Sequence, residues 1–176
     1  MSHATLHRKT EVDLNTSEII LRKSPVNIRD LLIYFRDQHL HSLEIQNISM
    51  MLQTIPDKII AMIDQEKVLQ ILNQFMENAL KALPDGGYID LKAYQQSNCV
   101  IISFIDNGLG IKEENLNKIK MGLTDFIIDN KMKLGVGLFI SRWIAQAHGG
   151  KIMVESVERQ GSIVSVCLPL ENSQKD

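Results

Sequence analysis

Apolar residues recur along this chain at two spacings, one typical of helices and one typical of strands. Residues 27–40 (NIRDLLIYFRDQHL) begin with Asn27, a residue type that commonly caps helices, and continue with an apolar stripe at helical spacing. That stripe consists of Ile28, Leu31, Leu32 and Phe35. A longer helix is predicted from a cap at Asp64 to about Leu83, with its apolar positions on one side of the helical wheel. They are Val68, Leu69, Ile71, Leu72, Phe75, Met76, Ala79, Leu80 and Leu83.

The remaining apolar runs are short and predict strands in pairs. The expected pairs are EIQNISMML with KIIAMID, YIDLKAY with CVIISFID, and KIMVESV with SIVSVCLPL. Two more helices are expected, a short one over about residues 112–120 and one that begins at Gly135 and ends near His148. Paired strands favour an antiparallel sheet, and each helix must bury one side. We therefore predict an α+β two-layer sandwich, with a mixed, mostly antiparallel sheet and about three helices on one face.

Composition limits the class of protein. The 176 residues suit one domain, which we expect over residues 25–171, followed by a polar tail at 172–176. A formal net charge of −2 argues against nucleic acid as a partner. No run of about 18 apolar residues occurs, so we expect no membrane contact by this segment, and a cytoplasmic location. The two cysteines, Cys99 and Cys167, lie in apolar runs and are expected to be buried free thiols.

Candidate chemistry begins where an apolar run ends in Asp106-Asn107-Gly108-Leu109-Gly110-Ile111. Glycines at this point allow a sharp turn and a close approach to the backbone. A partly desolvated Asp106 needs hydrogen-bond donors, and the amine of a planar base is one such donor. The alternative is a loop carboxylate that caps the helix beginning near Lys112.

Two further motifs accompany it. Gln74, Asn78 and Lys81 lie along one edge of the apolar stripe of the long helix. An amide oxygen suits Mg²⁺ and an ammonium group suits phosphate. The alternative is that these three polar residues simply lie on the solvent-exposed side of the helix, as most such sets do. Gly135 and Gly137 open the next helix, whose free N–H groups favour an anion.

In this order the three motifs resemble the nucleotide-binding boxes of the GHKL (Bergerat-fold) ATP-binding proteins, which include gyrase, MutL and histidine kinases. FMENALKAL, IDNGLGIKEENLNKI, GVGLFISRWIAQAHGGKIMVES and GSIVSVCLP look most like the catalytic and ATP-binding domain of a sensor histidine kinase. The resemblance implies ATP and Mg²⁺ as cofactors. It implies transfer of the γ-phosphoryl group to a histidine on a dimerisation domain, with a response regulator as a further partner. Residues 1–24 would then be a linker or the end of a helical dimerisation segment.

The resemblance also implies roles for individual residues. Asn78 would hold Mg²⁺ and Lys81 would contact phosphate, while Asp106 would accept the adenine amine. Gly108 and Gly110 would leave room for the base. The other expected contacts are Ile111, Gly135, Gly137, Leu138 and Ser162, with Lys131 or Lys133 reaching the γ-phosphate from a flexible lid between Gly110 and Gly135.

Some features depart from the family pattern. Gln74 stands where the gyrase branch has a glutamate that activates water, and this disfavours efficient hydrolysis while fitting phosphoryl transfer. His3 and His7 lie too close to Asn78 along the chain for either to be the phosphoacceptor of this family. We therefore expect the acceptor on another segment or chain. The full-length kinase could carry a membrane anchor. The isolated chain is expected to be a monomer. Alternatives are a nucleotide-sensing module without turnover and a serine kinase of the anti-sigma-factor type.

Overall fold

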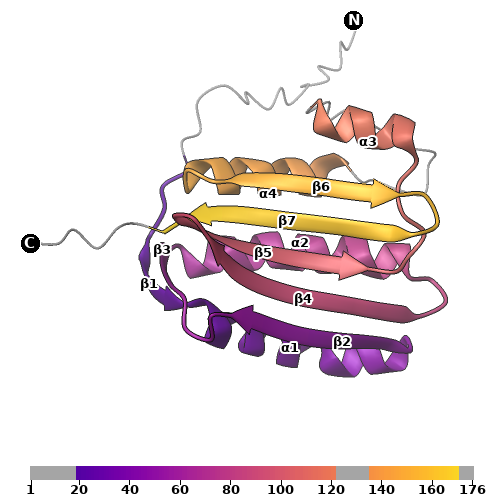
Figure 1. Cartoon of the computed structure of the whole chain (residues 1–176), viewed down its shortest axis with the longest axis horizontal. Helices are drawn as coiled ribbons and strands as arrows, with labels where there is room; N and C mark the ends of the chain where they lie inside the picture. The colour runs from indigo at the N-terminus through magenta and orange to yellow at the C-terminus, as the bar shows by residue number, and fades with distance from the viewer. Residues whose placement is uncertain (1–18, 122–134, 171–176) are drawn as a thin grey trace, which may run out of the picture.

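The computed structural model describes residues 19–121 and 135–170, in which a layer of helices packs on a main sheet (Figure 1). The strands are β1 (Ser24–Asn27), β2 (Ile48–Ile55), β3 (Ile60–Ile63), β4 (Gly87–Gln96), β5 (Cys99–Asp106), β6 (Lys151–Val157) and β7 (Gly161–Pro169). The helices are α1 (Ile28–Ile45), α2 (Gln65–Ala82), α3 (Glu113–Lys120) and α4 (Gly135–Ala147). The predicted α+β two-layer sandwich is confirmed, and the described residues form the four helices that the sequence indicated.

The main sheet has the strand order β2-β4-β5-β7-β6. All neighbours are antiparallel except β2 and β4, which run parallel with Ile48 opposite Gly87. The predicted pairing of the first two strands is wrong. β3 instead pairs with β1 in a separate two-stranded sheet, where Ser24 lies opposite Ile63. β1 was not predicted because four residues that include a proline are too few to show alternation.

Helix caps follow the sequence. The side chain of Asn27 accepts the backbone N–H of Arg29 at 3.2 Å, and Asp64 Oδ1 accepts that of Lys67 at 3.1 Å. Each cap satisfies a backbone donor that the first helical turn leaves unpaired. The two long helices therefore begin where the sequence predicted.

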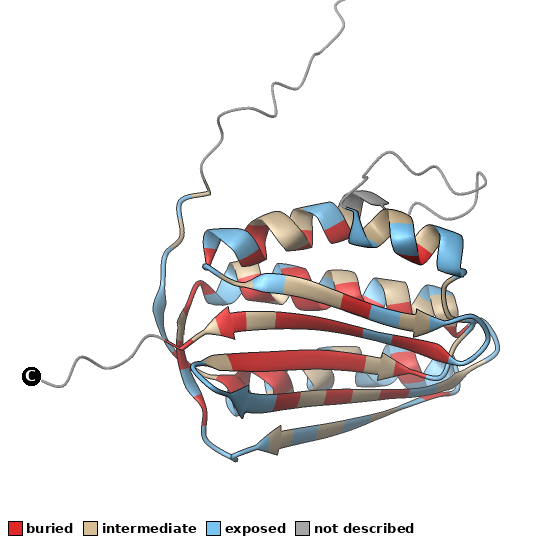
Figure 2. Cartoon of the chain, turned by 45° about the horizontal axis from the view of Figure 1, so that its top comes forward, coloured by how far each residue is buried: buried red, intermediate tan, exposed pale blue. Residues whose placement is uncertain are grey.

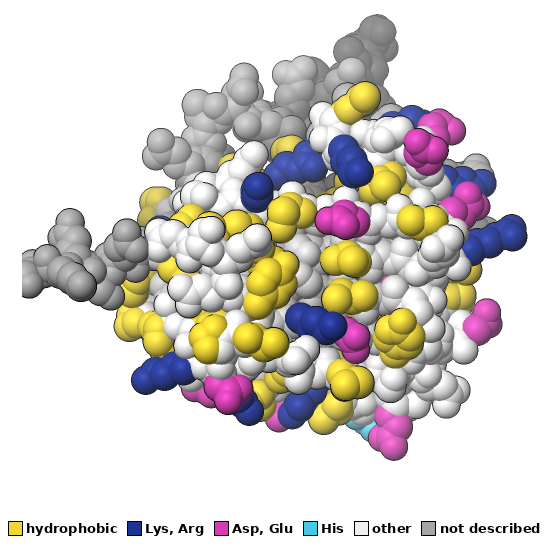
Figure 3. Space-filling model, in the orientation of Figure 1, with side chains coloured by type: hydrophobic (Ala, Val, Ile, Leu, Met, Phe, Trp, Pro, Cys, Tyr) yellow, Lys and Arg dark blue, Asp and Glu magenta, His cyan; other side chains and the backbone are white. Residues whose placement is uncertain are grey.

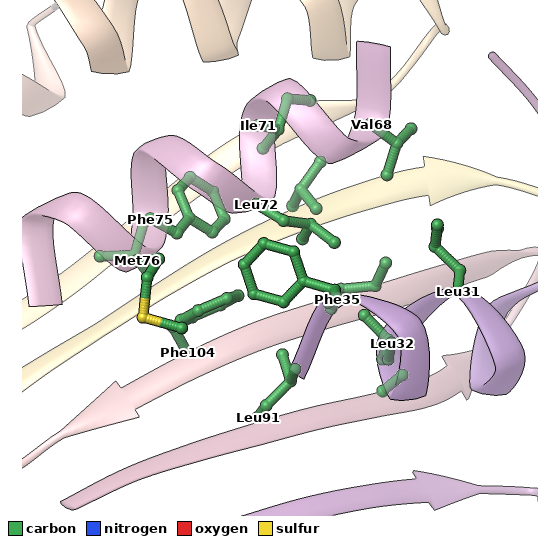
Figure 4. Packing of buried hydrophobic residues seen from close by; sticks show 14 of the residues in the cluster. Leu31, Leu32, Phe35, Val68, Ile71, Leu72, Phe75, Met76, Leu91 and Phe104 are labelled. Atoms are coloured by element: carbon green, nitrogen blue, oxygen red, sulfur yellow. The ribbon is translucent and has the colours of Figure 1, made fainter. Parts of the chain in front are cut away.

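The core lies between the helices and the sheet. Figure 4 shows the apolar sides of α1 and α2 meeting β4 and β5, with aromatic rings at the centre. The ring of Phe104 contacts those of Phe35 and Phe75 edge-on, at centroid distances of 5.8 and 5.7 Å. Such aromatic pairs add about 0.5–1.5 kcal/mol beyond burial of area. This packing holds α2 against β5, the two elements that carry Asn78 and Asp106.

The other face of the sheet is turned towards the viewer in Figure 3 and carries a mixture of apolar, polar and charged side chains. Burial alternates along β2 and β4 accordingly, whereas the central strand β5 is buried along most of its length (Figure 2). Cys99 and Cys167 lie on neighbouring strands and are free but only partly buried, so the expectation of buried thiols is corrected. Burial and a hydrogen bond with Cys99 raise the pKa of the Cys167 thiol to about 11.

Within the described residues, none of the helices is long and apolar enough to cross a membrane.

Candidate nucleotide-binding site

A pocket lies between α2 and the start of α4 on one side and β5, β6 and β7 on the other. Six of the predicted site residues line it: Asn78, Asp106, Gly110, Ile111, Leu138 and Ser162. Its other walls are apolar, namely Phe75, Ala79, Ala82, Phe104, Val154 and Val164. The predicted residues therefore converge on one cavity, although three strands and two helices lie between Asn78 and Ser162 along the chain.

Asp106 is the buried carboxylate of this pocket. It ends β5 with 6% of its surface exposed, and its Oδ1 accepts the backbone N–H of Gly108 at 2.9 Å. Burial raises the pKa of Asp106, while the backbone N–H groups of Gly108 and Ser162 act against that rise. An acceptor placed in an apolar pocket pairs best with a donor from a ligand, because water is largely excluded there.

The turn after β5 is held by contacts between backbone atoms. A Cβ on Gly108 would lie 2.3 Å from the carbonyl oxygen of Ala82, and one on Gly110 would lie 2.1 Å from that of Val157. Gly110 also has φ of +63°, a conformation that glycine adopts without strain. Both glycines are thus required by neighbouring backbone, and of the two only Gly110 lines the pocket.

A chain of hydroxyl groups supports the pocket wall formed by β6 and β7. Ser156 Oγ donates to the carbonyl oxygen of Gly161 at 2.9 Å and accepts the N–H of Ile111 at 2.8 Å. Because that proton is already used, Ser162 Oγ donates to Ser156 Oγ across 3.0 Å. Ser162 then keeps its lone pairs for a donor on a ligand. Ser156 was missed by sequence reasoning, since only the observed register places it opposite Ser162.

Asn78 stands in contact with Gln74 one turn earlier on α2. Gln74 Nε2 donates to Asn78 Oδ1 over 3.4 Å, a long and therefore weak hydrogen bond. A Cβ on Gly137 would lie 1.9 Å from Gln74 Cδ, so the start of α4 rests directly on this amide. Gln74 thus connects Asn78 to the helix that follows the predicted lid.

The remaining predicted residues lie outside the pocket lining. Lys81 is exposed in the last turn of α2, and Gly135 is the first residue of α4. Lys131 and Lys133 fall outside the described residues, as do His3 and His7. In residues 19–121 and 135–170, histidine is absent from the pocket lining, and three or more potential metal-ligating His, Cys, Asp or Glu side chains are nowhere grouped.

A buried carboxylate and an amide on a helix, set in an apolar pocket between the two layers of the sandwich, define a nucleotide-binding fold of the GHKL class. Residues 63–172 match the family described as histidine kinase-, DNA gyrase B- and HSP90-like ATPase. The chain belongs to this family, and its described fold is that of a histidine kinase catalytic domain.

Curated relatives are sensor kinases much longer than this chain. The sensor histidine kinase WalK of Bacillus subtilis is 31% identical over 131 residues, which are 71% of this chain and 21% of WalK. The circadian input-output histidine kinase CikA of Synechocystis is 36% identical over 112 residues, 62% of this chain and 15% of CikA.

Solved structures share the fold. The catalytic domain of the histidine kinase ThkA superposes with a TM-score of 0.74 at 25% identity, covering 85% of this chain and 98% of that domain. Full-length ShkA in complex with AMPPNP gives 0.75 at 22% identity, covering 88% of this chain and 32% of ShkA.

Proposed function

We propose that this chain binds Mg·ATP and transfers its γ-phosphoryl group to a histidine carried by another segment or chain. The observation that carries the proposal is the convergence of Asp106 and Asn78 on one pocket from β5 and α2. Family membership supports ATP as the nucleotide. The metal and the transfer step belong to the proposal.

The apolar end of the pocket suits the base. In this proposal Asp106 accepts a hydrogen bond from the adenine amine, and Ser162, whose proton goes to Ser156, offers a further acceptor beside it. Ile111 and Leu138 supply apolar surface on either side. Guanine presents a carbonyl oxygen where adenine has its amine, so it would place two acceptors against each other at Asp106.

The polar end of the pocket suits Mg²⁺ and phosphate. Mg²⁺ commonly takes one or two protein oxygens and completes its shell with phosphates and water, so the single amide of Asn78 fits the ion without an acidic cluster. When bound, Mg²⁺ would neutralise charge on the phosphates. Lys81, one turn further along α2, and the N-terminus of α4 would add positive potential.

The residues favour transfer to a protein over transfer to water. Gln74 occupies the position beside Asn78 where a general base would stand, and an amide takes up no proton at neutral pH. The acceptor histidine, a dimerisation domain and a response regulator are the proposed partners. ThkA has been crystallised with the response regulator TrrA, which supports a partner of that kind. We also propose that this chain is a monomer in isolation and lies in the cytoplasm.

Calorimetry of the whole chain with ATP, GTP and ATP without metal tests binding. Incubation of the chain with labelled ATP and a supplied histidine-bearing helical hairpin domain then tests transfer. We expect selective binding of Mg·ATP and acid-labile label on the hairpin. Equal affinity for GTP would contradict the role of Asp106. Tight binding with no transfer would favour the nucleotide-sensing module, and acid-stable label on a serine would favour the serine-kinase alternative.

A further inference from the structure

β2 is an edge strand of eight residues with one side open. It pairs with β4 on its inner side, and among the described strands none pairs with its outer side. Backbone N–H and C=O groups along such an edge are a template for a further strand. Figure 1 shows β2 at the lower margin of the sheet, with α1 behind it.

A cavity of about 350 Å³ follows this edge. It is lined by three residues of α1, three consecutive residues of β2 and one residue beyond: Arg29, Ile33, Arg36, Leu52, Gln53, Thr54 and Asp57. Leu52 and Thr54 point to the helix side of the sheet, while Gln53 points to the other side. A cavity lined by all three therefore opens onto the strand edge itself.

The walls of this edge groove differ in chemistry on the two sides of the sheet. On the helix side, Arg29 and Arg36 bring two guanidinium groups from one face of α1. On the other side, Met51 and Ile55 are 71% and 58% exposed. An added strand would alternate its side chains between these two environments.

Within residues 19–121 and 135–170, the ion pairs of these arginines are made with exposed carboxylates. Arg29 is paired with Asp57, which is 82% exposed, and Arg36 is paired with Asp37 at 2.7 Å. Ion pairs of this kind near the surface contribute little, because water competes for the exposed carboxylate. Carboxylates of a partner can therefore replace them without leaving a buried charge unpaired.

We propose that the edge groove binds an extended peptide segment in which acidic and apolar residues alternate, and that this segment adds a strand to β2. Its acidic side chains face Arg29 and Arg36, and its apolar side chains cover Met51 and Ile55. The two arginines are seven residues apart on α1, or roughly 10 Å along its axis. Carboxylates two or four positions apart on one side of a strand are roughly 7 or 13 Å apart, within reach of the flexible arginine side chains. Nothing in this proposal depends on the nucleotide site, to which β2 contributes no residue.

The test uses the whole chain and a fluorescein-labelled ten-residue peptide of alternating Glu and Val. A peptide of alternating Lys and Val controls for charge, and a composition-matched peptide with its Glu residues in one block controls for alternation. Fluorescence anisotropy up to millimolar chain concentration measures affinity, and hydrogen exchange locates the contact. We expect saturable binding of the alternating acidic peptide alone, weakened by salt, with protection of the backbone amides of β2.

Two substitutions with opposite expected effects test the assignment to these residues. Replacing both arginines (Arg29→Gln with Arg36→Gln) should weaken peptide binding at least about tenfold, whereas Asp57→Asn should strengthen it about threefold by removing a competing carboxylate. Arg22→Gln, at an exposed arginine outside the groove, is the matched control and should leave the affinity for the peptide unchanged. ATP affinity should be the same in all variants.

Several results would overturn the proposal. They are absence of binding at millimolar concentration, equal binding of the lysine peptide, protection confined to strands other than β2, and an unchanged affinity in the double arginine variant. Sedimentation of the chain without peptide tests whether a second copy of the chain occupies the groove instead. A dimer that protects β2 without any peptide would show that a second copy of this chain fills the edge.

Discussion

The ring of His148 joins the end of α4 to the start of α2. Its Nε2 accepts the backbone N–H of Asp64 at 3.0 Å, and its Nδ1 donates to the carbonyl oxygen of Ile144 at 2.9 Å. Only the neutral ring with its proton on Nδ1 satisfies both bonds. His148 thus fixes the relative position of the two helices that border the pocket.

This arrangement predicts a pH dependence of stability. Burial lowers the pKa of His148 and the charge of Lys23 adds to this, while the hydrogen bond to Ile144 and the charge of Asp64 oppose it. A lowered pKa means that the folded state favours the neutral ring. The contribution to the free energy of unfolding is therefore complete above the unfolded-state pKa of about 6.5 and is lost as pH falls towards the folded-state value.

Urea unfolding between pH 8 and pH 5 measures this effect, with His148→Gln as the comparison. The variant should show a flatter dependence, because an amide can occupy the site without titrating. Asp64 does not interfere in this range. Burial would raise the pKa of Asp64, but the backbone N–H groups of Arg22 and Lys67 and the charges of His148 and Lys67 lower it overall. An equally steep loss of stability in His148→Gln would contradict the assignment.

Replacement of Asn78 should separate function from folding. Asn78→Ala removes an amide whose hydrogen bond from Gln74 is weak, so the apo melting temperature should remain near that of the parent chain. Phosphoryl transfer should fall to background, because the proposed metal ligand is lost. Asn73→Ala on the same helix is the control: Asn73 is exposed and bonds to His39 at 3.2 Å, away from the pocket. A drop of several kcal/mol in apo stability for Asn78→Ala would instead make Asn78 structural.

Asp106→Asn should weaken ATP binding without weakening the apo fold. Because the pKa of Asp106 is raised in the folded state, its ionised form at neutral pH opposes folding, and the opposition disappears at low pH. Asparagine removes this charge and keeps one carbonyl oxygen. We expect an unchanged or higher melting temperature and roughly a 10–100-fold loss of ATP affinity, the equivalent of about 1.5–3 kcal/mol for a hydrogen bond to a charged group. Melting curves and calorimetry decide the matter, and unchanged affinity would refute the proposed contact.

Two glycines allow backbone strain to be separated from steric overlap. Gly161 and Gly149 both have positive φ, +93° and +77°. A Cβ on Gly161 would lie 1.9 Å from the carbonyl oxygen of Asp106, whereas one on Gly149 meets only Pro169 at 3.5 Å. Gly149→Ala should therefore cost about 1–2 kcal/mol from strain alone.

Gly161→Ala should cost more than Gly149→Ala, because the backbone at Asp106 must also move. Overpacking of this kind commonly adds about 1–3 kcal/mol. Denaturant unfolding of both variants measures the difference, and nucleotide affinity should fall only in Gly161→Ala. Equal losses of stability would show that the turn relaxes away from Asp106 without difficulty.

Much of the site could be predicted because its parts are local. The helical stripe of α2 placed Asn78 at the edge of the core, and the end of the apolar run placed Asp106 at the end of a strand. Periodicity and caps depend on residues within a few positions of one another, which is why these elements occur at the predicted bounds. The order of the motifs was enough to indicate the family.

Other features depended on contacts between residues far apart in the chain. The helices determine which strands meet, and so set the parallel pairing of β2 with β4 and the pairing of β1 with β3. A short apolar run does not indicate which other strand it will pair with. The partnership of Ser156 with Ser162 required the register of a hairpin, and that of His148 with Asp64 required the packing of two helices. The sequence by itself determined the helices, the longer strands and the chemical groups at their ends. The tertiary structure alone decided their neighbours, because strand pairing and helix packing satisfy backbone and side-chain groups across distances that no local pattern spans.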